Sequence, residues 1–318
     1  MPTPKRLPPL PRVTDILKLY GLRAKKQLSQ NFLLDLNVTD KIVRCGDNLS
    51  GGLVCEVGPG PGALTRSILN TGVEQVLVVE KDKRFLPSLE LLSDATDNKL
   101  IIHHGDVLDF DVEASCRDHV KPSPWEQDPP LFSIIGNLPF NISIPLLLRW
   151  LACIPKRSGP FAFGRTQMLL TFQKEVAERL TAPIGHHQRS RLSIMSQCWC
   201  DVKWCFTISG KSFVPAPKVD VAVVKFTPLV QPIINVHYNT LETVVKAVFQ
   251  YRRKMMIKGI RLLFPDNPRL ADVMLQSSGV DPSLRAQQLQ LEHIERLCMA
   301  YEEVTTQHPH TTSSSCHQ

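Results

Sequence analysis

The chain has 318 residues, 43% of them hydrophobic and 21% charged, which is enough for one full-size domain and a smaller second one. Its nine cysteines are scattered and form no C-x-x-C pair, which excludes a disulfide framework and the usual zinc motifs, so we predict a reducing compartment and no metal. The formal net charge of +7 favours polyanionic partners, and no apolar run is long enough to predict a membrane span.

The first 26 residues are strongly basic. They hold seven Lys and Arg side chains and one acidic residue, Asp15. Organelle transit peptides share this bias, whereas the several prolines and the lack of serine fit a solvated basic arm. Residues 1–26 are therefore interpreted as either a targeting segment or a basic arm.

Short apolar runs alternate with helical patterns over the next 200 residues. Strands are predicted within 51–58, 74–80, 98–106, 131–137 and 166–172, followed by two more strands within 198–208 and 218–228. Such alternation is typical of a parallel sheet covered on both faces by helices. We therefore predict an α/β domain over 27–230, with the last two strands closing the sheet as a hairpin.

The remainder of the chain has a different pattern. Apolar residues at helical spacing begin near Leu241, so a small helical domain is predicted over 240–303. The Ser/Thr- and His-rich tail, 304–318, is predicted to be disordered.

Three strand ends carry residues suited to one ligand. Gly58 opens the loop "GPGPG", Glu80 ends the second strand, and Asp106 follows the third. In an open α/β sheet, ligands bind at the carboxyl ends of the strands, where glycines allow close approach and a carboxylate accepts the hydroxyls of a ribose. Asp106 is expected to accept from the amino group of an adenine, so together the three residues indicate a nucleoside that carries an amino acid.

The fourth strand ends in "NLPF". We expect the side-chain oxygen of Asn137 and the backbone carbonyl of Leu138 to accept both protons of a base amino group and so free its lone pair. Phe140 offers a ring face on which an extruded base can stack. Alone, each of these strand ends also fits an ordinary turn or helix cap, and only their joint occurrence favours catalysis.

Eight segments in order resemble one known family. They are "SQNFL" (29–33), "EVGPGPGALT" (56–65), Glu80, "GDV" (105–107), "NLPFNIS" (137–143), "FQKEVAERL" (172–180), "RLSIMSQ" (191–197) and "FVPAPKVDVAVV" (213–224). In these segments the chain resembles the ribosomal RNA adenine N6,N6-dimethyltransferases over roughly residues 27–300, and most of all their mitochondrial members.

The resemblance implies a fold, a donor and an acceptor. The fold is a Rossmann-like class I methyltransferase with a seven-stranded, mostly parallel sheet and a small C-terminal all-α domain. The donor is S-adenosylmethionine, and the acceptors are two adjacent adenines in a hairpin loop near the 3′ end of mitochondrial small-subunit rRNA. The expected role is to support assembly of the small ribosomal subunit in the mitochondrial matrix.

The resemblance also implies site residues. The donor site would be lined by Asn31, Leu33, Gly58, Glu80, Lys81, Asp106, Val107 and Asn137. Bacterial members usually carry Tyr at the position of Phe140, so stacking is retained here and any role of a hydroxyl is not.

Two basic clusters complete the predicted interface. Arg189 and Arg191 belong to a loop after the fifth strand, and Arg252, Arg253, Lys254 and Lys258 are predicted to lie on a C-terminal helix. Such charges are often merely solvated, but here we expect them to clamp an RNA stem between the two domains.

Two other functions remain open at this stage. A nucleic-acid-binding protein that acts with the mitochondrial transcription machinery would keep the fold and lose the chemistry, although Glu80, Asp106 and Asn137 are intact. A small-molecule methyltransferase is disfavoured by the basic clusters and the C-terminal domain. We expect a monomer.

Overall fold

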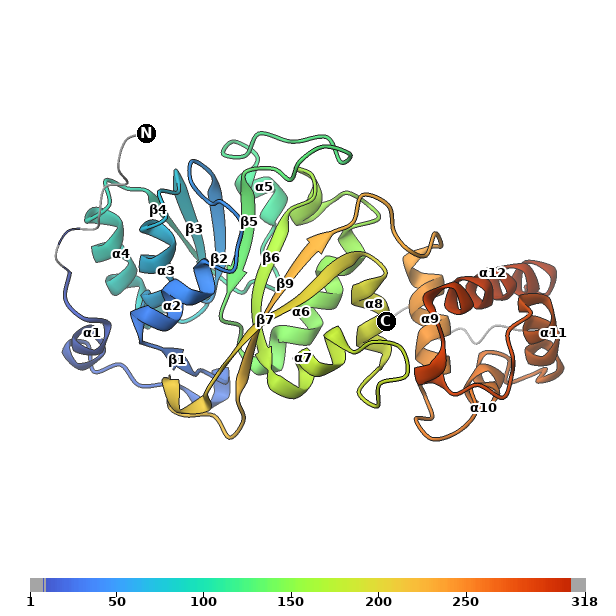
Figure 1. Cartoon of the computed structure of the whole chain (residues 1–318). Coiled ribbons are helices and arrows are strands. Elements are labelled where there is room, and N and C mark those ends of the chain that lie inside the picture. The colour runs from blue at the N-terminus through green and yellow to red at the C-terminus, as the bar shows by residue number, and fades with distance from the viewer. Residues whose placement is uncertain (1–7, 9, 310–318) are drawn as a thin grey trace. The chain divides into compact units, whose positions relative to one another are not determined.

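The computed structural model describes residue 8 and residues 10–309 (Figure 1). The chain divides into two compact units, the first running to Ala177 and including Val202–Val230, the second comprising Glu178–Asp201 and the residues from Gln231 onward. The predicted boundary near 230 agrees with this division, but residues 178–201, which were predicted to belong to the α/β domain, belong to the second unit. They do so because helix α8 (Arg191–Gln197) packs against helix α9 (Tyr238–Val248).

A seven-stranded sheet forms the centre of the first unit. Its strands are β2 (Leu53–Val57), β3 (Gln75–Glu80), β4 (Leu100–His104), β5 (Phe132–Gly136), β6 (Gln167–Gln173), β7 (Cys200–Ile208) and β9 (Val221–Pro228). The order across the sheet is β4-β3-β2-β5-β6-β9-β7. The first five strands in this order are parallel to one another, and β9 is antiparallel to β6. The predicted seven-stranded, mostly parallel sheet is confirmed.

The register of the central strands determines where the site lies. Val57, at the end of β2, pairs with Val79 on β3 and with Gly136 on β5. The loops after these three strands therefore leave the sheet from the same edge, as the sequence predicts.

Helices cover the sheet. Those of the first unit are α1 (Val13–Leu19), α2 (Leu36–Val43), α3 (Ala63–Leu69), α4 (Leu86–Asp94), α5 (Val112–Cys116), α6 (Phe140–Cys153) and α7 (Lys174–Thr181), of which α7 extends into the second unit. Side chains of α2, α3 and α4, such as Ile42, Ile68 and Leu89, form one buried cluster with Val54 and Val78 of the sheet. A separate two-stranded sheet pairs β1 (Phe32–Leu33) with β8 (Phe213–Val214).

The N-terminal segment is part of the first unit from Leu10 onward. Val13 and Ile16 of α1 are buried, and Leu10 and Leu17 pack against the same core cluster. The guanidinium of Arg66 donates a hydrogen bond to the carbonyl of Pro11 at 2.8 Å. The described part of the predicted arm is therefore folded, whereas Lys5 and Arg6 lie outside the described residues.

The second unit is helical, as expected. After α8 and α9 it contains α10 (Ile257–Ile260), α11 (Arg269–Ser278) and α12 (Leu291–Gln307). Because α12 continues to Gln307, residues 304–307 are not part of a disordered tail, and residues 310–318 lie outside the described chain. Every helix in the described part of the chain is too short or too polar to cross a lipid bilayer.

The burial of α1 leads to a stability prediction. Ile16 is 1% exposed, so Ile16→Ala should leave a cavity and lower the free energy of unfolding by about 2 to 4 kcal/mol. Leu19, on the same helix but 77% exposed, provides the control, since Leu19→Ala should change stability by less than about 0.5 kcal/mol. Urea unfolding measures both, and equal stability of the two variants would contradict the docking of α1.

Candidate active site

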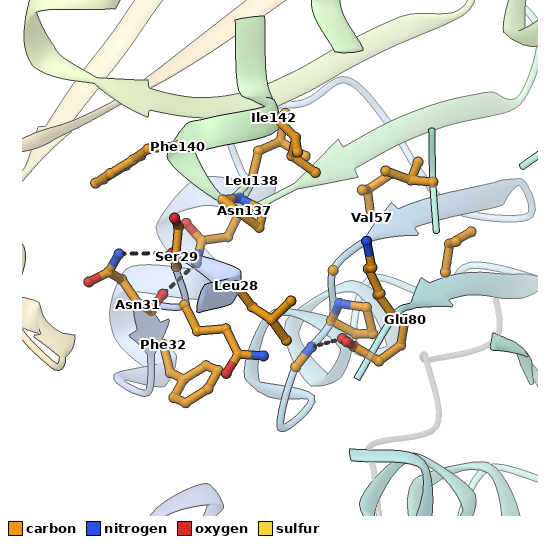
Figure 2. A pocket seen from close by; sticks show the side chains of 18 of the residues that line it. Leu28, Ser29, Asn31, Phe32, Val57, Glu80, Asn137, Leu138, Phe140 and Ile142 are labelled. Carbon is orange, nitrogen blue, oxygen red and sulfur yellow. Dashed lines mark hydrogen bonds between the residues drawn. The ribbon is translucent and has the colours of Figure 1, made fainter. Parts of the chain in front are cut away.

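A cavity opens at the carboxyl ends of β2, β3 and β5 (Figure 2). Every residue predicted for the donor site or the catalytic turn lines it: Asn31, Leu33, Gly58, Glu80, Lys81, Asp106, Val107, Asn137, Leu138 and Phe140. Further lining comes from the segment that leads into β1, including Leu28 and Ser29, and from Phe32 of β1 itself. Residues more than 100 positions apart in the sequence thus surround one space.

The glycine loop after β2 forms one wall of this cavity. Gly58, Gly60 and Gly62 have φ angles of +68°, +53° and +86°, which residues with a Cβ rarely adopt. Their conformation turns the chain sharply from β2 into α3. The predicted close approach of backbone to ligand has its structural basis here.

Glu80 ties this loop to the end of β3. One carboxylate oxygen accepts from the backbone N–H of Gly60 at 2.9 Å, and the other accepts from that of Asp82 at 2.7 Å. Burial raises the pKa of the Glu80 carboxyl above its ordinary value, although these two N–H groups oppose the rise. Glu80 is only 5% exposed, and it lines the cavity.

Asp82 connects the same corner to the N-terminal loop. Its carboxylate accepts from the Arg84 guanidinium and from the Gln30 amide, and it has a pKa of about 2 because Arg84 stabilises the charged form. Arg84 also donates to the carbonyl of Arg23 at 3.1 Å. The loop that carries Asn31 is therefore anchored beside Glu80.

Lys81 and Asp106 form an ion pair on the open side of the cavity. The ammonium nitrogen lies 2.5 Å from a carboxylate oxygen, and the Lys81 side chain is largely exposed. Burial tends to raise the pKa of Asp106, but the hydrogen bonds from Lys81 and from the N–H of Leu108 outweigh it and the pKa is lowered. Asp106 is thus an ionised acceptor at neutral pH.

Asn137 follows β5 directly and is held from two sides. Its amide nitrogen donates to the carbonyl of Asn31 at 3.2 Å, and its side-chain oxygen accepts from the Thr171 hydroxyl at 2.9 Å. Pro139 is the N-cap of α6, and its φ of −57° and ψ of 135° set the direction in which the helix begins. The turn is consequently rigid on both sides of the buried Leu138.

Phe140 separates this cavity from a second one. The second cavity is lined by Asn31, Phe140, Gln173, Pro217 and Lys218, among others. Because Phe140 and Asn31 line both spaces, the turn that is predicted to be catalytic lies where they meet. A donor on one side and an acceptor on the other would meet at this turn.

Comparison with known proteins agrees with this geometry. The sequence pattern of the family described as "Ribosomal RNA adenine dimethylase" matches residues 21–303. The chain belongs to this family. It is 56% identical over 306 residues to dimethyladenosine transferase 1, mitochondrial, of Xenopus tropicalis and equally so to that of Homo sapiens, covering 96% of this chain and 88% of each relative.

Solved structures share the fold. A dimethyladenosine transferase from Plasmodium falciparum superposes with a TM-score of 0.67 at 22% identity, covering 85% of this chain and 97% of that one. The 23S rRNA methyltransferase ErmE gives 0.59 at 23% identity, covering 86% and 100%. The predicted class I methyltransferase fold is confirmed, and the chain is an rRNA adenine dimethyltransferase.

One predicted RNA contact in this dimethylase is wrong. Arg189 is 3% exposed, and its guanidinium donates to the carbonyl of Ala182 and to the side-chain oxygen of Gln197. Burial also lowers its pKa. The buried guanidinium of Arg189 links Ala182 to Gln197, so it is not available to phosphate groups.

The second basic cluster also needs correction. Helix α9 ends at Val248, and Arg252, Arg253 and Lys254 lie in the turn before α10 instead of on a helix. The end of this turn is held against residues 284–285, because the backbone N–H of Met256 donates to the carbonyl of Leu284 and Met255 forms an antiparallel bridge with Arg285.

The two basic clusters belong to the same unit. Arg252 donates to the carbonyl of His187 at 2.7 Å, which places the turn against the loop that carries Arg189. The prediction that the two clusters lie on different domains is therefore wrong. Arg191, the first residue of α8, is partly exposed, and Arg253, Lys254 and Lys258 are exposed.

Sequence reasoning missed two polar residues that adjoin residues of the site. Thr171 contacts Asn137, as described above. Glu56 is fully buried in β2, and neither of its carboxylate oxygens has a hydrogen-bond partner among the described residues. The one feature of the sequence that could have drawn attention to Glu56 is its position two residues before Gly58, because an acidic residue in a strand does not by itself indicate a functional site.

Glu56 leads to a pH prediction. Burial raises its pKa from 4.5 to about 8, and the Glu80 carboxylate adds to the rise. Between these values the unfolded chain has released the proton that the folded chain retains, so stability should fall as pH rises through this window. The Glu56→Gln variant cannot lose this proton, so its stability should not fall for this reason. The free energy of unfolding of the variant minus that of wild type should therefore increase up to about pH 8 and then level off.

Urea unfolding across this pH range measures the difference. Glu90→Gln, on the exposed surface of α4, is the matched control and should follow wild type. A constant difference between Glu56→Gln and wild type at all pH values would show that Glu56 is ionised in the fold.

Proposed function

We propose that the protein uses S-adenosylmethionine to dimethylate N6 of two adjacent adenines in a hairpin loop near the 3′ end of mitochondrial small-subunit rRNA. The site of action is the mitochondrial matrix, and the modification supports assembly of the small ribosomal subunit. The family and the mitochondrial relatives support this proposal, and the arrangement around Asn137 is the observation that carries it.

The first cavity fits the donor. A ribose with two hydroxyls suits the Glu80 carboxyl group, which lines the cavity and is already oriented by two backbone N–H groups. Asp106 is an ionised acceptor for the exocyclic amino group of the donor adenine, and the exposed Lys81 is free to move aside. The positive φ angles of the glycine loop leave room for the amino-acid portion.

S-adenosylmethionine supplies an electrophilic methyl group on a sulfonium. The protein must provide an adenine nitrogen with an available lone pair, which is normally delocalised into the ring. The Asn137 side-chain oxygen and the Leu138 carbonyl accept the two N–H protons and favour a pyramidal nitrogen. The acceptor base enters from the second cavity and lies on Phe140, and the displaced proton leaves to water or a polar group there.

RNA affinity comes from the second unit. Arg191, Arg253, Lys254 and Lys258 offer charge to phosphates, which gives sequence-independent and salt-sensitive binding. Identity of the base is then read in the pocket around the catalytic turn.

The donor assignment predicts a loss of affinity. Glu80→Ala removes a buried acceptor, and S-adenosylmethionine binding should weaken by roughly 2 to 3 kcal/mol, the scale of a lost pair of charge-assisted hydrogen bonds. Isothermal titration calorimetry measures this, with Glu90→Ala as an exposed control. Unchanged affinity in a folded Glu80→Ala protein would overturn the assignment.

Catalysis and RNA binding should separate by mutation. Asn137→Ala should lower single-turnover methyl transfer by on the order of 10² while RNA affinity stays the same. Arg253→Gln with Lys258→Gln should weaken RNA binding and reduce the slope of log affinity against log salt by about two, leaving donor binding unchanged.

Filter binding and single-turnover assays on a hairpin RNA with two adjacent loop adenines test both expectations. Lys99→Gln with Lys121→Gln removes the same charge from exposed positions of the first unit and controls for net charge. If Asn137→Ala reacts at the normal rate but binds RNA poorly, the turn is only a binding surface and the proposed function fails.

A further inference from the structure

The hydroxyl of Thr171 makes a contact that the proposed chemistry does not yet use. Thr171 lies on β6, and the pairing of Gly136 with Leu170 places it directly beside Asn137, the residue after β5. Its hydroxyl donates to the Asn137 side-chain oxygen at 2.9 Å. The side chain is 1% exposed, so water does not compete freely for this bond.

The opposite side of the Asn137 amide has an equally defined partner. The carbonyl of Asn31 can only accept, so the atom that faces it at 3.2 Å must be the amide nitrogen. The Asn31 carbonyl therefore specifies the rotation of the amide, and the Thr171 hydroxyl, which is able to donate or to accept, donates to the oxygen that this rotation places against it. An amide rotated by 180° would place its nitrogen against Thr171 and its oxygen against the Asn31 carbonyl.

The rotation matters for the reaction. A side-chain oxygen has two lone pairs, one of which receives the Thr171 hydroxyl while the other remains for an N–H of the acceptor adenine. In the rotated amide the NH₂ group would face the adenine NH₂, and two donors would repel. The correct rotation is therefore required before the acceptor nitrogen can be activated.

We propose that Thr171 is a positioning residue: its hydroxyl holds the Asn137 side-chain oxygen in place for the acceptor amino group, in the rotation that the Asn31 carbonyl specifies. The inference rests on the proposed function, because it assumes that Asn137 accepts from the acceptor base. Thr171 itself does not touch the substrate; it acts through the orientation of Asn137.

The experiment compares side chains with and without a hydroxyl at position 171. Thr171→Val and Thr171→Ala lack the donor and should lower the single-turnover methylation rate about tenfold, the scale of one buried hydrogen bond. Thr171→Ser retains the donor and should react within about twofold of wild type. The affinities for S-adenosylmethionine and for the hairpin RNA should be unchanged in all three, so the loss appears in the rate and not in binding.

Thr166 offers a matched control. It is also fully buried, it lies just before β6, and its hydroxyl donates to the carbonyl of Pro160 at 2.6 Å, away from the catalytic turn. Thr166→Val should lower stability to a similar extent as Thr171→Val without slowing methyl transfer. A rate loss shared by both valine variants would indicate general damage to the sheet and overturn the proposal.

The remaining outcomes are also decisive. A normal rate in Thr171→Val or Thr171→Ala would show that the hydroxyl is dispensable, and an equal loss in Thr171→Ser would assign the effect to packing of the methyl group. Either result overturns the inference while the proposed function stands, provided that Asn137→Ala remains slow. If Asn137→Ala reacts normally, the proposed function itself has failed.

Discussion

The buried carboxylate of Glu80 is the interaction on which the site depends. It binds the backbone of Gly60 and of Asp82 at the same time, and so it fixes the glycine loop after β2 relative to the end of β3. Without an acceptor there, two buried N–H groups would lose their partners at a cost of about 1 to 3 kcal/mol each. The same carboxylate that is proposed to hold the ribose thus also builds the walls around it.

The influence of this corner extends to the N-terminus. Asp82 is held by Arg84 and Gln30, and Arg84 reaches the carbonyl of Arg23. The loop that carries Asn31 is positioned by these contacts, and its carbonyl in turn binds Asn137. The proposed ribose side and the proposed methyl-acceptor side of the cavity are therefore connected through the N-terminal segment, which the buried face of α1 stabilises.

Much of the fold and of the cavity was predictable from the sequence, because both follow from local periodicity. Parallel strands of similar length end at one edge, so Gly58, Glu80, Asp106 and Asn137 could be expected to converge once the strands were recognised. The basic clusters were harder to interpret, since charge alone does not show whether a side chain is solvated. Arg189 can be buried because a backbone carbonyl and a side-chain amide oxygen of its own unit accept from it, and these contacts are not encoded in the periodicity of the sequence.

The same distinction explains what was missed within the site. Asn137 was recognised by its own motif, but its partners lie 34 residues later in Thr171 and 106 residues earlier in Asn31. A side-chain amide has two nearly isosteric ends, and only its neighbours decide which end faces the substrate. The motif therefore specifies that an acceptor is present, whereas the strand register and the anchored N-terminal loop specify where that acceptor points. Catalytic competence in this dimethylase is for that reason a property of the assembled sheet and not of the four-residue turn alone.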